Sequence, residues 1–204
     1  KNDSISKEIS NILYNKKIFC INLMGSPGSG KTTLIENLSE FIPNIYVIEG
    51  DLKSDIDLKR LKQKNISAYQ INTHSGCHLN ANMILEAINK IKFNKTEFLF
   101  IENVGNLVCP AGVLIGQNLN ILASATTEGF DKPEKYPLIF QDSEIIVITK
   151  YDLSEIVEFN LEEYQNLIKS KFPNKIILKT SKKDFKSIEE LAKILIKKRN
   201  QFFN

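Results

Sequence analysis

The sequence predicts a doubly wound α/β fold, in which a mostly parallel sheet of about seven strands carries helices on both faces. Two observations lead to this prediction. Short apolar runs alternate with segments of helical periodicity, and most of the runs are apolar at nearly every position. A strand of that kind is buried on both faces, which is typical of a parallel sheet covered by helices. The alternation of strands with helices favours crossover connections and therefore parallel strands.

The elements follow one another in a regular order. The run IFCINLM ends at a Gly-rich turn and is followed by KTTLIENLSEFI, whose apolar residues have helical spacing. The predicted strands are 18–24, 44–49, 66–72, 97–103, 120–126, 144–149 and 175–180. The predicted helices are 31–42, 55–64, 81–92, 133–140, 160–170 and 187–200, preceded by an amphipathic helix at about 3–16. With no internal repeat or long linker in this pattern, we expect residues 1–204 to form a single domain.

Composition narrows the class of protein. The chain has 204 residues, of which 42% are hydrophobic and 25% charged, which is ordinary for a globular domain with one sizeable core. A net charge of +3 is too small to indicate a nucleic-acid partner. The apolar runs have strand length and do not predict a membrane span. Three cysteines make no disulfide framework, so we expect a reducing, cytoplasmic setting.

The stretch GSPGSGKT at 25–32 matches the phosphate-loop pattern G-x-x-x-x-G-K-[ST] between a predicted strand and a predicted helix. Gly28 and Gly30 allow the backbone to turn its N–H groups toward phosphate oxygens. Lys31 is expected to reach the β- and γ-phosphates, and the Thr32 hydroxyl to bind Mg²⁺. The nucleotide-binding residues predicted in this P-loop NTPase motif are Gly25, Ser26, Gly28, Ser29, Gly30, Lys31, Thr32 and Thr33. Ser26 stands where the dimeric "deviant" P-loop ATPases carry a lysine, which disfavours that subclass.

A second motif bears on the choice of base. TKYD at 149–152 follows a predicted strand and resembles the guanine-recognition motif N-K-x-D of GTPases, with Thr149 in place of Asn. Asp152 would accept hydrogen bonds from the guanine N1–H and amino group, and Lys150 would lie along the base. Ser181, after the next strand, stands where GTPases contact the guanine O6 through the backbone. The alternative is a turn in which Asp152 caps a helix.

Acidic residues end two other predicted strands. Asp51 closes IYVIEGD, and Glu102 closes FLFIE at the start of ENVG. The carboxyl ends of parallel strands meet at the edge that holds the phosphate loop, so either carboxylate could hold Mg²⁺. ENVG resembles the D-x-x-G switch of GTPases, which makes Gly105 a candidate γ-phosphate sensor. Lys31, Asp51 and Glu102 are the predicted catalytic residues, although a cap or turn role remains possible for each acid alone.

Soft metal ligands occur at the same edge. Cys77 and His78 follow the third predicted strand, and Cys109 follows the strand that ends at Glu102. Two thiolates and an imidazole suit Zn²⁺ or Ni²⁺ better than Mg²⁺. Cys20 lies inside a strand and is predicted to belong to the core. Buried, inert cysteines remain the alternative for Cys77 and Cys109.

The ordered set of motifs is similar to a known family. The stretches GSPGSGKT, VIEGDL, GCHLNANMI, FIENVGNLVCPA, TEGFDKPEKYP and TKYDL resemble the hydrogenase/urease nickel-incorporation GTPases, the HypB family. The likeness runs from about residue 18 to 200. It implies a slow SIMIBI-class GTPase that uses GTP/GDP and Mg²⁺ and assists nickel delivery to the large subunit of [NiFe]-hydrogenase. It also implies a GTP-dependent homodimer with Zn²⁺ or Ni²⁺ held by Cys77, His78 and Cys109 at the interface, and a nickel co-chaperone, HypA, as partner.

The metal loop departs from the family pattern, and other functions remain open. The family usually reads T-G-K-x-C-H-L-D where this chain reads THSGCHLN, so His74 is an extra potential ligand and Asn80 replaces an acid. The alternatives are a urease-type nickel GTPase, a P-loop kinase or ATPase with inert cysteines, and a metal-binding protein without hydrolysis. For a nickel-incorporation GTPase, we expect that a γ-phosphate which orders Asp51 and ENVG also moves the metal ligands.

Overall fold

A single seven-stranded sheet organises the molecule. The computed structural model describes residues 2–51, 56–73 and 76–204. Among the described strands every neighbouring pair is parallel, and their order is β3-β2-β4-β1-β5-β6-β7. The strands are β1 (Phe19–Gly25), β2 (Ile45–Asp51), β3 (Ser67–Asn72), β4 (Phe98–Glu102), β5 (Leu119–Ala125), β6 (Ile145–Thr149) and β7 (Ile176–Thr180). The predicted fold class is confirmed.

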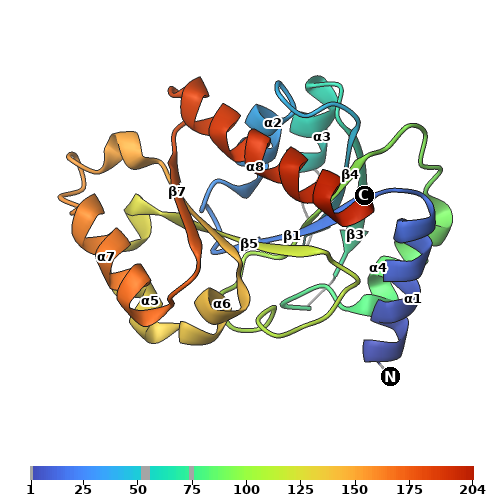
Figure 1. Cartoon of the computed structure of the whole chain (residues 1–204), viewed down its shortest axis with the longest axis horizontal. Helices are drawn as coiled ribbons and strands as arrows, with labels where there is room; N and C mark the ends of the chain where they lie inside the picture. Colours follow the sequence, from blue (N-terminus) through green and yellow to red (C-terminus); the bar gives the residue numbers. More distant parts are fainter. Residues whose placement is uncertain (1, 52–55, 74–75) are drawn as a thin grey trace.

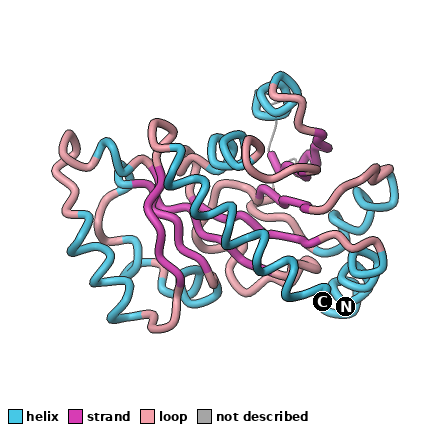
Figure 2. Tube along the Cα trace, turned by 45° about the horizontal axis from the view of Figure 1, so that its top comes forward, coloured by secondary structure: helices cyan, strands magenta, loops and turns pink. Residues whose placement is uncertain are grey.

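Helices cover both faces of this sheet (Figures 1 and 2). On one face lie α2 (Lys31–Leu38), α3 (Ile56–Gln63) and α8 (Phe185–Phe203). On the other face, α1 (Asn2–Asn15) and α4 (Ala81–Lys90) cover one half. The remaining half is covered by α5 (Lys132–Lys135), α6 (Pro137–Asp142) and α7 (Leu161–Lys171). Two short 3₁₀ turns, η1 (Thr126–Glu128) and η2 (Tyr151–Leu153), follow β5 and β6.

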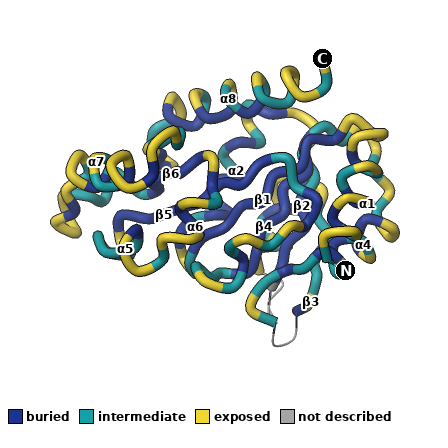
Figure 3. Tube along the Cα trace, turned by 60° about the horizontal axis from the view of Figure 1, so that its bottom comes forward, coloured by how far each residue is buried: buried dark blue, intermediate teal, exposed yellow. Residues whose placement is uncertain are grey.

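The central strand β1 shows why the apolar runs predicted this arrangement. All seven of its residues are buried. Ile21 and Leu23 belong to the core under α2 and α8, whereas Cys20 belongs to the core under α1 and α4. Burial of such a side chain contributes about 1.5–3 kcal/mol, so a strand buried on both faces fixes the middle of the sheet. Figure 3 shows the central strands as the buried interior between more exposed helices.

The predicted helix at 133–140 is wrong in one respect, because two short helices occupy this stretch. α5 ends at Lys135 and α6 begins at Pro137, with Tyr136 between them at φ −129° and ψ 54°. Proline lacks the N–H that would continue the helix, and it disfavours helical geometry in the residue before it.

The connection from β4 to β5, residues 103–118, contains no helix in the structure. Irregular connections of this length are uncommon in compact domains and often carry function. This connection is held at its far end by α1, because the Asn2 side chain donates to the Leu114 carbonyl at 2.7 Å and the Ser6 hydroxyl accepts from the Gly116 N–H at 2.9 Å. Asn2 also accepts from the Ala81 N–H at 3.1 Å, at the start of α4.

No helix in the described ranges is both long and apolar enough to cross a lipid bilayer.

Candidate functional site

The phosphate loop lies where β1 ends and α2 begins. Gly30 precedes α2 at φ +89°, a left-handed conformation that glycine adopts without steric cost. The Lys31 ammonium donates to the carbonyls of Gly25 and Ser26, at 3.2 Å each. Burial lowers the pKa of Lys31, and the nearby Glu102 carboxylate opposes that effect. The carbonyls of the loop therefore hold the Lys31 ammonium at the centre of the loop.

A cavity of about 430 Å³ opens in front of this loop. It is lined by Gly28, Gly30, Lys31, Thr32 and Thr33 of the loop, by Glu49, Gly50, Glu102 and Gly105 of neighbouring strand ends, and by Asp57 and Arg60 of α3. Of the predicted loop residues, Gly25, Ser26 and Ser29 do not line it. Their carbonyls instead accept hydrogen bonds from Lys31 and Thr149.

Thr32 and Glu102 meet inside this cavity. The Thr32 hydroxyl donates to Glu102 Oε1 at 2.7 Å. Glu102 Oε2 is buried, and no described residue supplies it with a hydrogen bond. Burial raises the pKa of Glu102 to about 7, although Lys31 and the Thr32 hydroxyl act in the opposite direction. A buried carboxylate oxygen beside a hydroxyl is a donor set that suits Mg²⁺. Asp51 ends β2, but its side chain lies outside the described part of the structure.

Gly105 lies directly against the phosphate loop. A Cβ atom at this position would lie 2.8 Å from the Pro27 nitrogen, so only glycine allows the two backbones to approach this closely. The next residue, Asn106, donates its N–H to the Gly25 carbonyl at 3.1 Å. The segment after β4 is therefore attached to the loop, in the place where a γ-phosphate sensor is expected.

Sequence reasoning did not select Asp57 and Arg60. Arg60 donates to Glu36 at 2.7 Å, to Asp57 at 3.1 Å and to the Thr33 hydroxyl at 3.1 Å. Asp57 and Arg60 have the spacing of a surface ion pair on a helix, and the sequence of 55–64 predicted a helix without a role in the site. The available signal was the position of α3, which follows the acidic end of β2.

A second cavity, of about 330 Å³, lies beside the first and shares Gly30, Thr33 and Lys150 with it. Asp152 and Ser181 line it, as do Leu34 and Asn37 of α2, Thr149, Thr180, Lys182 and Lys183. The cavity therefore brings together the two segments predicted to bind a base.

The TKYD segment is attached to the phosphate loop through two side chains. The Thr149 hydroxyl donates to the Ser29 carbonyl at 2.6 Å. Lys150, at φ +58°, places its ammonium 2.7 Å from the Gly28 carbonyl. These contacts place the second cavity at a fixed position relative to the first, and threonine in place of asparagine still makes a contact with the loop.

Asp152 is held as a charged acceptor at this cavity. Hydrogen bonding from Ser181 is the main cause that lowers the Asp152 pKa, and Lys183 adds to it from 3.4 Å. The Ser181 N–H lies 3.4 Å from the Ser187 hydroxyl, at the start of α8. An ionised carboxylate at the cavity wall can accept two hydrogen bonds from a planar base that presents adjacent N–H groups.

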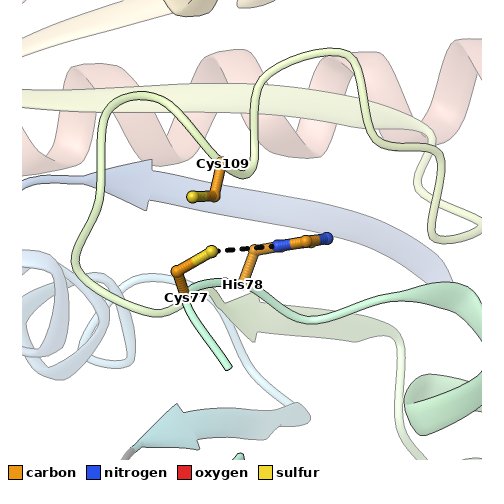
Figure 4. A group of neighbouring side chains, drawn as sticks. All are labelled: Cys77, His78 and Cys109. Carbon is orange, nitrogen blue, oxygen red and sulfur yellow. Dashed lines mark hydrogen bonds between the residues drawn. The ribbon is translucent and has the colours of Figure 1, made fainter. Parts of the chain in front are cut away.

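The three soft ligands converge at the same edge of the sheet. The ligand atoms of Cys77, His78 and Cys109 all lie within 4.8 Å of one another, and they are the one such group of three found among the described residues. Figure 4 shows the two cysteines facing each other from separate loops, with His78 beside Cys77. The Cys77 sulfur and His78 Nδ1 are 3.6 Å apart. Hydrogen bonding with Cys77 is the main cause that raises the pKa of Cys109.

Other residues near this group have clear positions. Cys20 is fully buried in the core, and burial raises the pKa of its thiol. Asn80 caps α4, because its side-chain oxygen accepts from the Met83 N–H at 3.1 Å. Asn and Asp are equally good helix caps, so this departure from the family pattern keeps its capping role. His74, the extra candidate ligand, lies outside the described residues.

The family follows from a comparison with known proteins. Residues 19–179 match the family described as CobW/HypB/UreG, nucleotide-binding domain, a range that includes the phosphate cavity and all three soft ligands. The chain belongs to the CobW/HypB/UreG family. It is 38% identical to the hydrogenase/urease maturation factor HypB of Helicobacter pylori, over 98% of this chain and 85% of that protein.

Solved structures of this family agree with the fold. The crystal structure of HypB from Helicobacter pylori in complex with nickel superposes with a TM-score of 0.95 at 38% identity, and covers 100% of this chain and 97% of that one. The hydrogenase maturation factor HypB from Archaeoglobus fulgidus gives a TM-score of 0.89 at 34% identity, over 100% of this chain and 98% of that one. These two HypB structures thus share the architecture described above.

Proposed function

We propose that this protein is a GTP-hydrolysing metallochaperone that assists nickel insertion into [NiFe]-hydrogenase, with metal binding linked to the nucleotide state. The observation that carries the proposal is the convergence of Cys77, His78 and Cys109 at the sheet edge that also holds the phosphate loop. The names of the HypB relatives, which describe hydrogenase/urease maturation factors, support the same role. They also make urease the second candidate client.

Support for GTP comes from Asp152 in the second cavity. Guanine presents N1–H and an amino group side by side, and an ionised carboxylate accepts from both. Adenine offers an acceptor at N1, which would face the same carboxylate unfavourably. The low pKa of Asp152 keeps it an acceptor at neutral pH. Preference for ATP over GTP in direct competition would instead favour a kinase or ATPase.

The hydrolytic step would depend on positioning and charge. Lys31 would bind the β- and γ-phosphates, and the Thr32 hydroxyl with Glu102 and Asp51 would hold Mg²⁺. When bound, Mg²⁺ supplies positive charge to the phosphates. Glu102 would keep Mg²⁺ at the end of β4. Loss of the γ-phosphate would then alter the position of the segment that leads from β4 to Cys109. We expect slow turnover, on the order of 10⁻⁴ to 10⁻² per second, as in GTPases without a supplied arginine.

The nickel cargo would be held by the three soft ligands. Nickel and zinc both accept thiolate and imidazole, so Zn²⁺ is an alternative occupant. A second copy of the chain would complete the shell in a GTP-dependent homodimer. The exposed apolar side chains of Val108 and Leu114, 63% and 48% exposed, flank the Cys109 loop and support such a contact. Further partners of this proposal are a nickel co-chaperone of the HypA type and the hydrogenase large subunit.

The proposal is tested by measuring Ni²⁺ and Zn²⁺ affinity with GDP and with a non-hydrolysable GTP analogue. Size-exclusion chromatography of the same samples gives the oligomeric state. We expect metal affinity and the monomer–dimer balance to change together with the nucleotide. Equal affinities and an unchanged balance would overturn the proposal. Adding apo-hydrogenase large subunit or apo-urease then separates the two clients by nickel transfer.

Replacement of Cys109 by alanine should weaken Ni²⁺ binding by more than the roughly 10- to 100-fold that loss of an outer-shell partner costs. Phosphate release should persist, because Cys109 does not line the nucleotide cavities. Cys20→Ala is the matched control, since it removes a thiol that is buried in the core. Metal titration followed by the thiolate charge-transfer absorbance reads out both variants. Equal losses in the two would contradict the assignment.

Replacement of Glu102 by glutamine should raise the Mg²⁺ concentration needed for hydrolysis by about tenfold or more, because a neutral amide loses the charge while keeping an acceptor for the Thr32 hydroxyl. The measurement is phosphate release against Mg²⁺ concentration at saturating GTP. Glu97→Gln, at the opposite edge of the sheet, should leave the curve in place. An unshifted curve for Glu102→Gln would remove Glu102 from the Mg²⁺ site.

A further inference from the structure

Asn103 lies at the wall of the phosphate cavity and connects it to the Cys77–His78 metal loop. It follows Glu102 at the end of β4 and is 2% exposed. Its side-chain oxygen accepts two hydrogen bonds at 3.0 Å, one from the Leu79 N–H and one from the Val104 N–H. Its amide nitrogen donates to the Asn22 side chain at 3.1 Å. These three partners fix the orientation of the amide. If the amide were flipped, its NH₂ group would face the N–H groups of Leu79 and Val104.

Leu79 lies between the two strand ends that carry the Mg²⁺ candidates. It directly follows His78 and is fully buried. Its side chain packs against Gly50, where a Cβ atom would lie 2.7 Å from the Leu79 Cγ. Gly50 directly precedes Asp51, and Asn103 directly follows Glu102. The residue next to the metal ligands therefore contacts the ends of both β2 and β4.

The amide of Asn103 is itself anchored in the centre of the sheet. Asn22, on β1, donates to the Asn120 side chain of β5 at 3.0 Å and accepts from Asn103. Asn120 in turn donates to the Asp142 carbonyl at 3.2 Å. This chain of buried amides ties Asn103 to the strand that leads into the phosphate loop. Because the Leu79 N–H is buried and has its acceptor in Asn103, a shift of one residue requires a shift of the other.

The other metal loop has a separate attachment. The Asn106 side chain accepts from the Cys109 N–H at 3.0 Å and donates to the Cys109 sulfur at 3.5 Å. Asn106 is held on the Gly25 carbonyl of the phosphate loop. Loss of the Asn103 contact would therefore release the Cys77–His78 loop and leave Cys109 in place.

We infer that Asn103 is a positioning residue that transmits the nucleotide state from the end of β4 to the Cys77–His78 metal loop, through the Leu79 N–H. This inference rests on the proposed function and names the contact through which its regulation acts. A γ-phosphate that moves Glu102 and Gly105 displaces the Asn103 side chain between them. Leu79 follows, and the distance from Cys77 and His78 to Cys109 changes with it.

The test compares Ni²⁺ dissociation constants with GDP and with a non-hydrolysable GTP analogue, in the full chain and three variants. In wild type we expect the two constants to differ by roughly 5- to 150-fold, the usual range for coupled sites. Asn103→Ala should reduce this ratio to near one at nucleotide concentrations that saturate the variant, because Asn103 also lines the phosphate cavity. Asn103→Asp keeps an acceptor for the Leu79 N–H but loses the hydrogen bond to Asn22, and it should retain more of the ratio than Asn103→Ala. Asn120→Ala removes a buried amide that does not contact Leu79. This variant should keep the wild-type ratio of the two dissociation constants.

The outcomes separate the inference from the function on which it rests. No nucleotide dependence in wild type would overturn both. Dependence in wild type that persists unchanged in Asn103→Ala would overturn the inference alone. Hydrogen exchange at the Leu79 amide of wild type decides the matter if Asn103→Ala does not fold. Different exchange rates in the two nucleotide states support the inference, and identical rates overturn it.

Discussion

Replacing Asp152 by asparagine is expected to lower the affinity for GTP by about 10²- to 10⁴-fold and to create affinity for XTP. The carboxylate would accept two charge-assisted hydrogen bonds from guanine, each contributing about 1.5–3 kcal/mol. An asparagine amide can donate to the carbonyl that xanthine carries in place of the guanine amino group. The expected result is therefore an exchange of preference, which a general loss of stability would not produce.

Competition titration with GTP, XTP and ATP measures this exchange, and Asp184→Asn is the matched control. Asp184 directly follows Lys183, which lines the base cavity, but Asp184 does not line it. It accepts from the Tyr151 hydroxyl at 2.6 Å and from the Ser187 N–H at 3.3 Å as the cap of α8. Asparagine caps a helix as well as aspartate does, so this variant should retain its preference for GTP. If Asp152→Asn still binds GTP more tightly than XTP, Asp152 does not form the hydrogen bonds that select the base.

Replacing Lys31 by alanine is expected to lower the rate of GTP hydrolysis by about 10²- to 10³-fold or more, the usual cost of removing one charge-stabilising donor from a reacting centre. The fold should persist, because the hydrogen bonds that the Lys31 ammonium makes to described residues go to the carbonyls of Gly25 and Ser26 in the same loop. Nucleotide affinity should fall as well, since the ammonium would contact the phosphates in the bound state.

Phosphate release at saturating GTP, with thermal unfolding of the same sample, separates catalysis from stability. Lys175→Ala is a suitable control, because Lys175 donates to the Gln141 carbonyl at the opposite edge of the sheet. Its rate should match wild type. A loss below tenfold in Lys31→Ala would remove Lys31 from the reacting centre.

Much of the fold could be predicted because its signal is carried by single segments. A run such as IFCINLM is apolar on both faces, and that property alone identifies a central parallel strand. The convergence of Cys77 with Cys109 could also be predicted, although 32 positions separate them, because strand ends in a parallel sheet share one edge. The metal role of these residues stays a prediction.

The features that sequence reasoning missed depend on contacts between distant segments. Arg60 reads as half of an exposed ion pair, and only the packing of α3 against α2 turns it toward the phosphate cavity. No sequence pattern distinguishes Asn103 from an ordinary turn residue, because asparagine is common after a strand. Only its contact with the Leu79 N–H, 24 positions away in the chain, shows its role. The break between α5 and α6 does have a local signal, because Pro137 disfavours helical geometry at Tyr136.

The attachment of α1 gives both metal loops a common dependence on one peripheral helix. Its first turns bind Ala81, where the Cys77–His78 loop enters α4, and Leu114 and Gly116, which follow Cys109. Local unfolding of α1 would release these three backbone groups together, so helix detachment and metal release become one equilibrium. A ligand that binds only the docked form stabilises that form by mass action. Metal occupancy of the site formed by Cys77, His78 and Cys109 would then determine how quickly a protease cuts α1.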